Sequence, residues 1–74
     1  GVKAGVPDLF LPIPRGAFHG LFVEMKYGKN KQTDSQKQWE QRLTEQRYAY
    51  FICYSWGEAA EMIEKYLKQG GTRK

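Results

Sequence analysis

Hydrophobic and polar positions divide the first third of the chain into two short apolar runs. The run over residues 9–13 predicts a strand that fades at Pro12, because proline has no N–H to donate to a neighbouring strand. Residues 14–16, Pro-Arg-Gly, are typical of a turn, and Gly20 opens a second apolar run that ends at Lys26. The two runs together predict a β-hairpin.

The middle of the chain alternates between helical and extended patterns. Residues 27–32 are polar and predict a surface loop, after which Thr33 can cap a helix that extends to about Arg47. Side chains recur in that segment at helical spacing, at Gln36, Trp39 or Glu40, and Leu43. Aromatic and β-branched residues then fill positions 48–54, which predicts a strand buried largely on both faces.

The last helical pattern begins after Ser55, which forms a capping box with Glu58. Its apolar stripe comprises Ala59, Ile63, Tyr66 and Leu67. The glycine pair at 70–71 should end this helix, and residues 71–74 should form a flexible tail. We therefore expect a single domain over residues 1–70.

The predicted order is strand, strand, helix, strand, helix, which indicates an α/β fold built on a mixed sheet. The third strand can return to the sheet only by a crossover through the helix that follows Thr33. We expect helices on only one face of this sheet, which would leave the other face bare. Because the chain begins almost at its first strand, we also expect that an N-terminal helix is missing.

Size and composition narrow the class of protein. A chain of 74 residues has room for one small hydrophobic core, so a partner subunit is the expected source of further stability. Cys53 is the only cysteine, so no internal disulfide can form, and with His19 far away in sequence the two residues give no zinc site.

The net charge of +4 favours an anionic partner. No long apolar span or signal peptide is visible, so we expect a soluble, cytoplasmic protein without a membrane partner.

Two opposite charges interrupt the second apolar run. Glu24 and Lys26 are two residues apart, so both side chains point to the same side of a strand. Burying them costs several kcal/mol unless they pair, bind a metal or reach solvent. The hairpin could bring Asp8 close to Glu24, and two neighbouring carboxylates favour a cation such as Mg²⁺ or Mn²⁺ between them. The plainer alternatives are a turn aspartate at position 8 and a solvated, charged edge strand.

Such a site would cut phosphodiester bonds. The metal would polarise a phosphate and lower the pKa of a bound water, while Lys26 would orient or deprotonate that water. Residues 5–7, Gly-Val-Pro, would aim the Asp8 carboxylate and leave room for a nucleic-acid backbone to approach.

Basic and aromatic residues follow the charged strand. The candidate DNA contacts are Lys29 and Lys31 in the predicted loop and Lys37 in the next helix, although they could serve only solubility. A larger aromatic set is expected in the core or at a dimer surface rather than as a base-stacking platform: Trp39, Tyr48, Tyr50, Phe51 and Tyr54.

The segments Gly5-Val6-Pro7-Asp8-Leu9 and Glu24-Met25-Lys26, with Gln36 and Trp39 downstream, resemble the virus-type replication-repair nuclease (VRR-NUC) family of the PD-(D/E)XK superfamily. The resemblance covers nearly the whole chain and implies a restriction-endonuclease-like mixed sheet. It implies that Asp8, Glu24 and the Met25 backbone carbonyl bind Mg²⁺ or Mn²⁺. It also implies that Lys26 is the catalytic lysine and that Gln36 reaches the site, although Gln36 could instead serve only as a capping-box residue after Thr33. Family members carry an N-terminal helix whose glutamate completes the metal site, and no residue before Asp8 matches it.

Three functions are compatible with this pattern. The preferred one is a metal-dependent, structure-specific DNA endonuclease, similar to Holliday-junction resolvases of phages or prophages, that acts on branched DNA as a homodimer. The alternative is a nucleic-acid-binding module that keeps the nuclease fold and does not cut. The third is a structural oligomerisation domain, which would show no salt-sensitive DNA binding.

Overall fold

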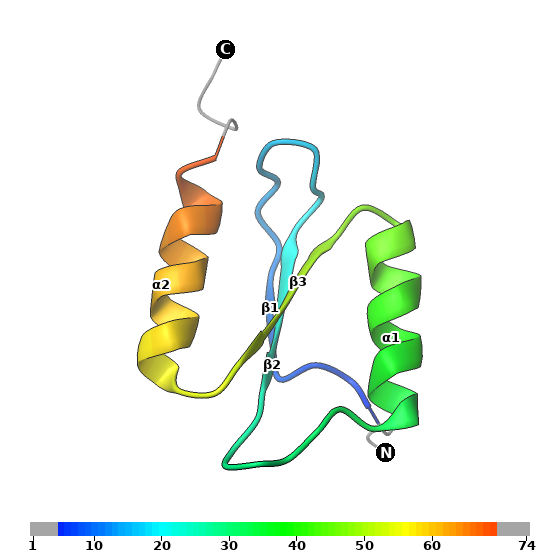
Figure 1. Cartoon of the computed structure of the whole chain (residues 1–74). Helices are drawn as coiled ribbons and strands as arrows, with labels where there is room; N and C mark the ends of the chain where they lie inside the picture. Colours follow the sequence, from blue (N-terminus) through cyan, green and yellow to red (C-terminus); the bar gives the residue numbers. More distant parts are fainter. Residues whose placement is uncertain (1–4, 70–74) are drawn as a thin grey trace.

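A three-stranded mixed sheet forms the centre of the molecule, and its middle strand is β2 (Leu21–Met25) (Figure 1). The computed structural model describes residues 5–69, so the predicted glycine stop at 70–71 and the tail at 71–74 lie outside the described residues. The elements follow the predicted order: β1 (Leu9–Leu11), β2 (Leu21–Met25), α1 (Asp34–Glu45), β3 (Ala49–Cys53) and α2 (Trp56–Leu67).

The pairing of the strands confirms the predicted hairpin and crossover. β1 runs antiparallel to β2, with Leu9 opposite Val23, because the two strands are joined by a short connection. β2 runs parallel to β3, with Met25 opposite Cys53, and α1 provides the crossover that a parallel pair requires. Among residues 5–69, neither α1 nor α2 has the length and apolar composition that a membrane-spanning helix needs.

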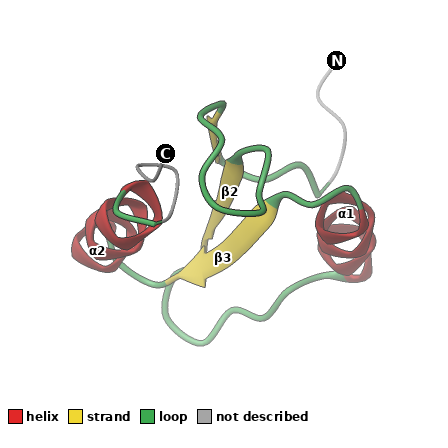
Figure 2. Ribbon diagram, turned by 90° about the horizontal axis from the view of Figure 1, so that it is seen from above, coloured by secondary structure: helices red, strands yellow, loops and turns green. Residues whose placement is uncertain are grey.

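The two helices lie on opposite faces of the sheet, as the end-on view shows (Figure 2). The expectation of helices on only one face was therefore wrong. Alternate residues of the strands face each helix, and those that face α2 form the hydrophobic core with it. The buried members of this core are Leu21, Val23, Met25, Ala49, Cys53, Ala59 and Tyr66. The face toward α1 instead carries two buried polar side chains, Glu24 of β2 and Lys26 directly after it.

The ends of the strands depart little from the sequence pattern. β1 stops at Leu11, immediately before Pro12, as the missing N–H of proline requires. β3 is shorter by one residue at each end than the pattern at 48–54, and it is less buried than predicted. Phe51 and Ile52 are only partly buried because β3 lies at the edge of the sheet.

Both helices begin at the predicted cap residues. Thr33 accepts a hydrogen bond from the Gln36 N–H at 3.2 Å, and the Gln36 side chain accepts from the Thr33 N–H at 2.8 Å, which completes a capping box. At α2 only half of the predicted box forms. Ser55 accepts from the Glu58 N–H at 3.0 Å, but the Glu58 carboxylate accepts from the N–H of Tyr54 rather than that of Ser55.

The connection between β1 and β2 folds over the C-terminal end of α2. A tight turn pairs Arg15 with Phe18, which confirms the turn predicted at 14–16. The Arg15 Nε donates to the Leu67 carbonyl at 3.0 Å, where the end of a helix leaves carbonyls without intrahelical partners. The buried Tyr66 hydroxyl donates to the Ile13 carbonyl at 2.7 Å. These contacts fix the hairpin connection to α2.

α1 ends two residues before the predicted boundary, in a turn that places Arg47 in the left-handed region with φ of 69°. The Arg47 N–H donates to the Thr44 carbonyl and the Tyr48 N–H to the Leu43 carbonyl, each at 3.0 Å. This pair of bonds is the Schellman motif, in which glycine is the usual residue at the left-handed position. Arginine tolerates that conformation only at a steric cost.

We expect Arg47→Gly to raise the free energy of unfolding by about 0.5–1 kcal/mol, because glycine adopts a positive φ without the clash of a Cβ atom. Urea unfolding followed by circular dichroism would measure the change. Arg42→Gly, within α1, is the matched control and should lower stability by about 0.5–1 kcal/mol. Equal destabilisation by both substitutions would contradict the strain assigned to Arg47.

Candidate active site

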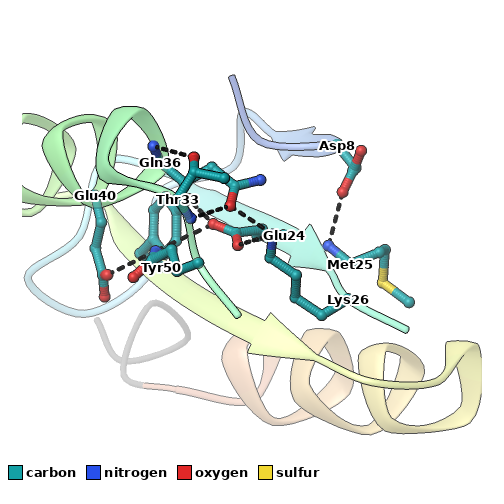
Figure 3. Close-up of polar contacts among 9 residues, drawn as sticks. Asp8, Glu24, Met25, Lys26, Thr33, Gln36, Glu40 and Tyr50 are labelled. Carbon is teal, nitrogen blue, oxygen red and sulfur yellow. Dashed lines mark hydrogen bonds and ion pairs between the residues drawn. The ribbon is translucent and has the colours of Figure 1, made fainter. Parts of the chain in front are cut away.

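Glu24 is a carboxylate buried on the sheet face that α1 covers, with 1% of the residue exposed (Figure 3). The Tyr50 hydroxyl donates to Glu24 Oε1 at 2.5 Å, and Gln32 Nε2 donates to the same oxygen at 3.2 Å. Glu24 Oε2 has no hydrogen-bond partner among residues 5–69 and lies 3.5 Å from Lys26 Nζ. One carboxylate oxygen is therefore fully engaged, while the other is held only by an ion pair.

Lys26 is the second buried charge on this face, with 8% of the residue exposed. Its Nζ donates to Gln36 Oε1 at 2.5 Å, besides its ion pair with Glu24. The same Gln36 oxygen accepts from the Thr33 N–H, so Gln36 both caps α1 and contacts the lysine. The two roles considered for Gln36 are thus filled by one side chain.

Asp8 lies at the start of β1 and is exposed. Its Oδ2 accepts a hydrogen bond from the Met25 N–H at 2.7 Å, which is the peptide that follows Glu24 (Figure 3). The Lys26 N–H donates to Cys53 on the β3 side, and peptide groups alternate along a strand, so the Met25 carbonyl faces the β1 side with Asp8. The hairpin therefore brings Asp8 to the backbone between the two predicted metal ligands of β2.

The glycine before this aspartate is required by the packing of α1. Gly5 has a φ of +84°, and a Cβ at this position would lie 2.7 Å from the Ser35 carbonyl carbon and 2.9 Å from the Gln36 nitrogen. The space that we expected to admit a nucleic-acid backbone is thus occupied by the first turn of α1. The segment leading to Asp8 and the turn that carries Gln36 are packed against each other.

The donor atoms at this end of the sheet are those that Mg²⁺ and Mn²⁺ prefer. Asp8 and Glu24 offer carboxylate oxygens and Met25 a backbone carbonyl, and the buried Glu24 Oε2 has no hydrogen bond to lose. Within residues 5–69 no group of three acidic, histidine or cysteine side chains could hold a metal ion. The donor atoms present are therefore of the kind that an oxygen-ligand cation takes, and two of the donor groups are carboxylates.

The three candidate DNA contacts are exposed and lie close in sequence to the buried pair. Lys29 and Lys31 are in the loop that leaves β2, which turns at Gly28 with a φ of +59°. Lys37 is on the first turns of α1, directly after Gln36. The segment that carries these lysines therefore begins directly after Lys26 and ends directly after Gln36, the residue to which Lys26 donates.

Sequence reasoning missed three residues that contact the site: Gln32, Glu40 and Tyr50. Tyr50 was assigned to the core or a dimer surface with the other aromatic residues, yet its hydroxyl binds Glu24, while Tyr54 is half-exposed. Burial and the hydrogen bond to Glu24 raise the pKa of Tyr50, so the hydroxyl stays protonated and donates. The spacing of Gln36 and Glu40, one helical turn apart, was a signal for Glu40. Nothing in the pattern singled out Gln32.

Cys53 lies apart from this chemistry. It is buried beneath α2, and burial raises the pKa of its thiol, as expected for a structural cysteine. A shallow depression along α2, lined by Ala60, Glu61, Ile63, Glu64 and Leu67, likewise belongs to the helix on the other face of the sheet. The polar cluster is confined to the side of α1.

Comparisons with known proteins place the chain in a family. A family model described as the VRR-NUC domain matches residues 1–56. A solved structure described as a VRR_NUC domain protein shares 38% sequence identity and covers 92% of this chain, with a TM-score of 0.84. This chain spans 57% of the length of that one, and no curated protein matches it. The chain therefore belongs to the VRR-NUC domain family, which is a family of nuclease type.

Proposed function

We propose that this chain is the catalytic part of a metal-dependent, structure-specific DNA endonuclease that hydrolyses phosphodiester bonds. The observation that carries the proposal is the buried pair of Glu24 and Lys26, in which one carboxylate oxygen has no hydrogen bond. A pair kept only for stability would have little advantage over apolar residues of the same size. A carboxylate and an ammonium held side by side are instead suited to a cation and a phosphate.

Asp8, Glu24 and the Met25 carbonyl would hold Mg²⁺ or Mn²⁺. When bound, such an ion polarises a phosphate and lowers the pKa of a coordinated water. Lys26 has three N–H groups: Gln36 accepts one, and the ion pair with Glu24 orients a second without a hydrogen bond, so one remains for a water or a phosphate oxygen. Gln36 fixes the ammonium and thus the direction of that remaining N–H.

Branched DNA is the proposed substrate, and a homodimer is the proposed assembly. A four-way junction has two equivalent strands to cut, and a two-fold symmetric dimer presents one active site to each. Resolvases of phages and prophages work on such junctions inside the bacterial cytoplasm, and the resemblance of the sequence supports the same role here. The exposed lysines of the β2–α1 loop would contact phosphates that flank the cut.

A second function is supported by the incomplete set of ligands. Within the described part of the chain, no group of three acidic, histidine or cysteine side chains could hold a metal ion, which leaves Asp8 and Glu24 as the proposed side-chain ligands. A protein that binds junction DNA through its lysines without cutting it would keep every other feature of the site. Cleavage assays separate this possibility from the endonuclease.

Lys26→Ala should lower the rate of Mg²⁺- or Mn²⁺-dependent cleavage of an end-labelled four-way junction by about 10²–10⁴-fold, because the lysine acts on the reacting water or phosphate. Lys65→Ala, an exposed lysine of α2, is the matched control and should cleave at the parent rate. Glu24→Gln provides a second variant in case the unpaired Glu24 unfolds Lys26→Ala. Cleavage that survives both substitutions would refute the assigned site, and binding without cleavage by the parent would favour the second function.

Replacing Lys29, Lys31 and Lys37 by alanine should reduce the dependence of DNA affinity on salt. Each lysine that contacts a phosphate contributes about −0.9 to the slope of log K against log salt concentration, so the triple variant should lose about 2–3 from that slope. Fluorescence anisotropy on a labelled junction at several salt concentrations would measure it. Lys65→Ala on α2 combined with Lys68→Ala at its C-cap should leave the slope unchanged. An unchanged slope in the triple variant would exclude these contacts.

A further inference from the structure

The hydrogen bonds of Glu24 are unequally divided between its two oxygens. Oε1 receives the Tyr50 hydroxyl and the Gln32 amide, while Oε2 receives no hydrogen bond from the described residues. Each carboxylate oxygen has about two lone-pair sites, so two donors fill Oε1. The oxygen that remains for a further ligand is Oε2, on the side of Lys26.

We propose that Tyr50 is a positioning residue that, together with Gln32, occupies Glu24 Oε1 and so reserves Oε2 for the divalent cation. This inference rests on the proposed function, because it assigns a role to residues behind the proposed metal ligand. Groups that hydrogen-bond to a metal ligand fix its orientation and strengthen its binding. Tyr50 is suited to that role because it is a rigid, buried side chain on β3, and its hydroxyl is the closer of the two donors.

Gln32 is oriented by a second carboxylate. Its Nε2 donates to Glu24 Oε1 at 3.2 Å and to Glu40 Oε1 at 3.0 Å. Because both neighbours are acceptors, the amide must present its nitrogen to them rather than its oxygen. Glu40, on α1, thereby fixes Gln32 as a donor to Glu24 and connects the helix to the carboxylate.

The alternative is that the Tyr50 hydroxyl binds Glu24 only to satisfy its own buried polar group. The chain contains a matched case. Tyr66 is also buried, and its hydroxyl donates to the Ile13 carbonyl at 2.7 Å on the opposite face of the sheet. Removing either hydroxyl deletes one buried hydrogen bond, but only Tyr50 contacts a proposed metal ligand.

The test compares Mn²⁺ binding by the parent chain, Tyr50→Phe and Tyr66→Phe, measured from the electron paramagnetic resonance signal of free Mn²⁺. Tyr50→Phe should weaken Mn²⁺ binding about 10–100-fold, the range expected when a metal ligand loses an outer partner. Tyr66→Phe should bind Mn²⁺ as the parent does, even if its melting temperature falls equally. In cleavage assays the concentration of Mn²⁺ that gives half the maximal rate should rise with Tyr50→Phe alone.

Gln32→Ala keeps the test decisive if Tyr50→Phe does not fold, because Gln32 lies outside the strands and helices and supplies the other donor to Oε1. It should weaken Mn²⁺ binding less than Tyr50→Phe does. Equal Mn²⁺ affinity in the parent, Tyr50→Phe and Gln32→Ala would overturn the positioning role and leave the proposed function intact. A parent chain that binds no Mn²⁺ would overturn the proposed function and this role with it.

Discussion

The burial of Glu24 and Lys26 between the sheet and α1 is the constraint on which the rest of the structure depends. Two charges removed from water are stable together only when each also finds hydrogen bonds. The ion pair alone, at 3.5 Å, leaves most of their hydrogen-bonding groups without partners. The partners come from three parts of the fold: Tyr50 from β3, Gln36 from α1, and Gln32 from the loop before α1. Gln32 is in turn held by Glu40 of α1. These polar contacts connect α1 to the sheet.

The two faces of the sheet differ in the side chains that they bury: one is apolar and the other carries the buried charges. Toward α2, alternate residues of β2 and β3 are apolar and provide the core of a small domain. Toward α1 lie the charges of Glu24 in β2 and of Lys26 directly after β2, and no residue of α1 is fully buried. One central strand therefore serves stability and chemistry at once, because a period of two separates its side chains cleanly. Substitutions in the core can be judged separately from those in the site.

The order of the strands and helices, and the way in which the strands pair, could be predicted from the sequence. Local signals decided these features: Pro12 ends β1, Thr33 and Ser55 cap the helices, and the parity of Glu24 and Lys26 puts both on one face. The sides on which the helices lie were not predictable, because partly apolar helices can cover either face of a short sheet. That choice depends on packing between elements distant in sequence.

The contacts of the site were only partly predictable for the same reason. The hairpin register brings Asp8 next to β2, but whether it meets a side chain or a peptide N–H depends on the local path of the backbone. The parallel register places Tyr50 of β3 opposite Phe22 of β2, so the Tyr50 hydroxyl reaches Glu24 diagonally across the two strands. An aromatic residue in a buried strand gives no sign of which polar atom its hydroxyl will meet.

The double use of the Gln36 side chain limits what can replace it. Glutamate is the other residue that completes a capping box, and it would serve the start of α1 as well as glutamine does. At this position it would also put a second negative charge beside Lys26, in addition to that of Glu24. The ammonium would then be neutralised within the protein and would attract a phosphate less strongly. A neutral acceptor therefore lets the helix begin at the active site while leaving the lysine its charge for the substrate.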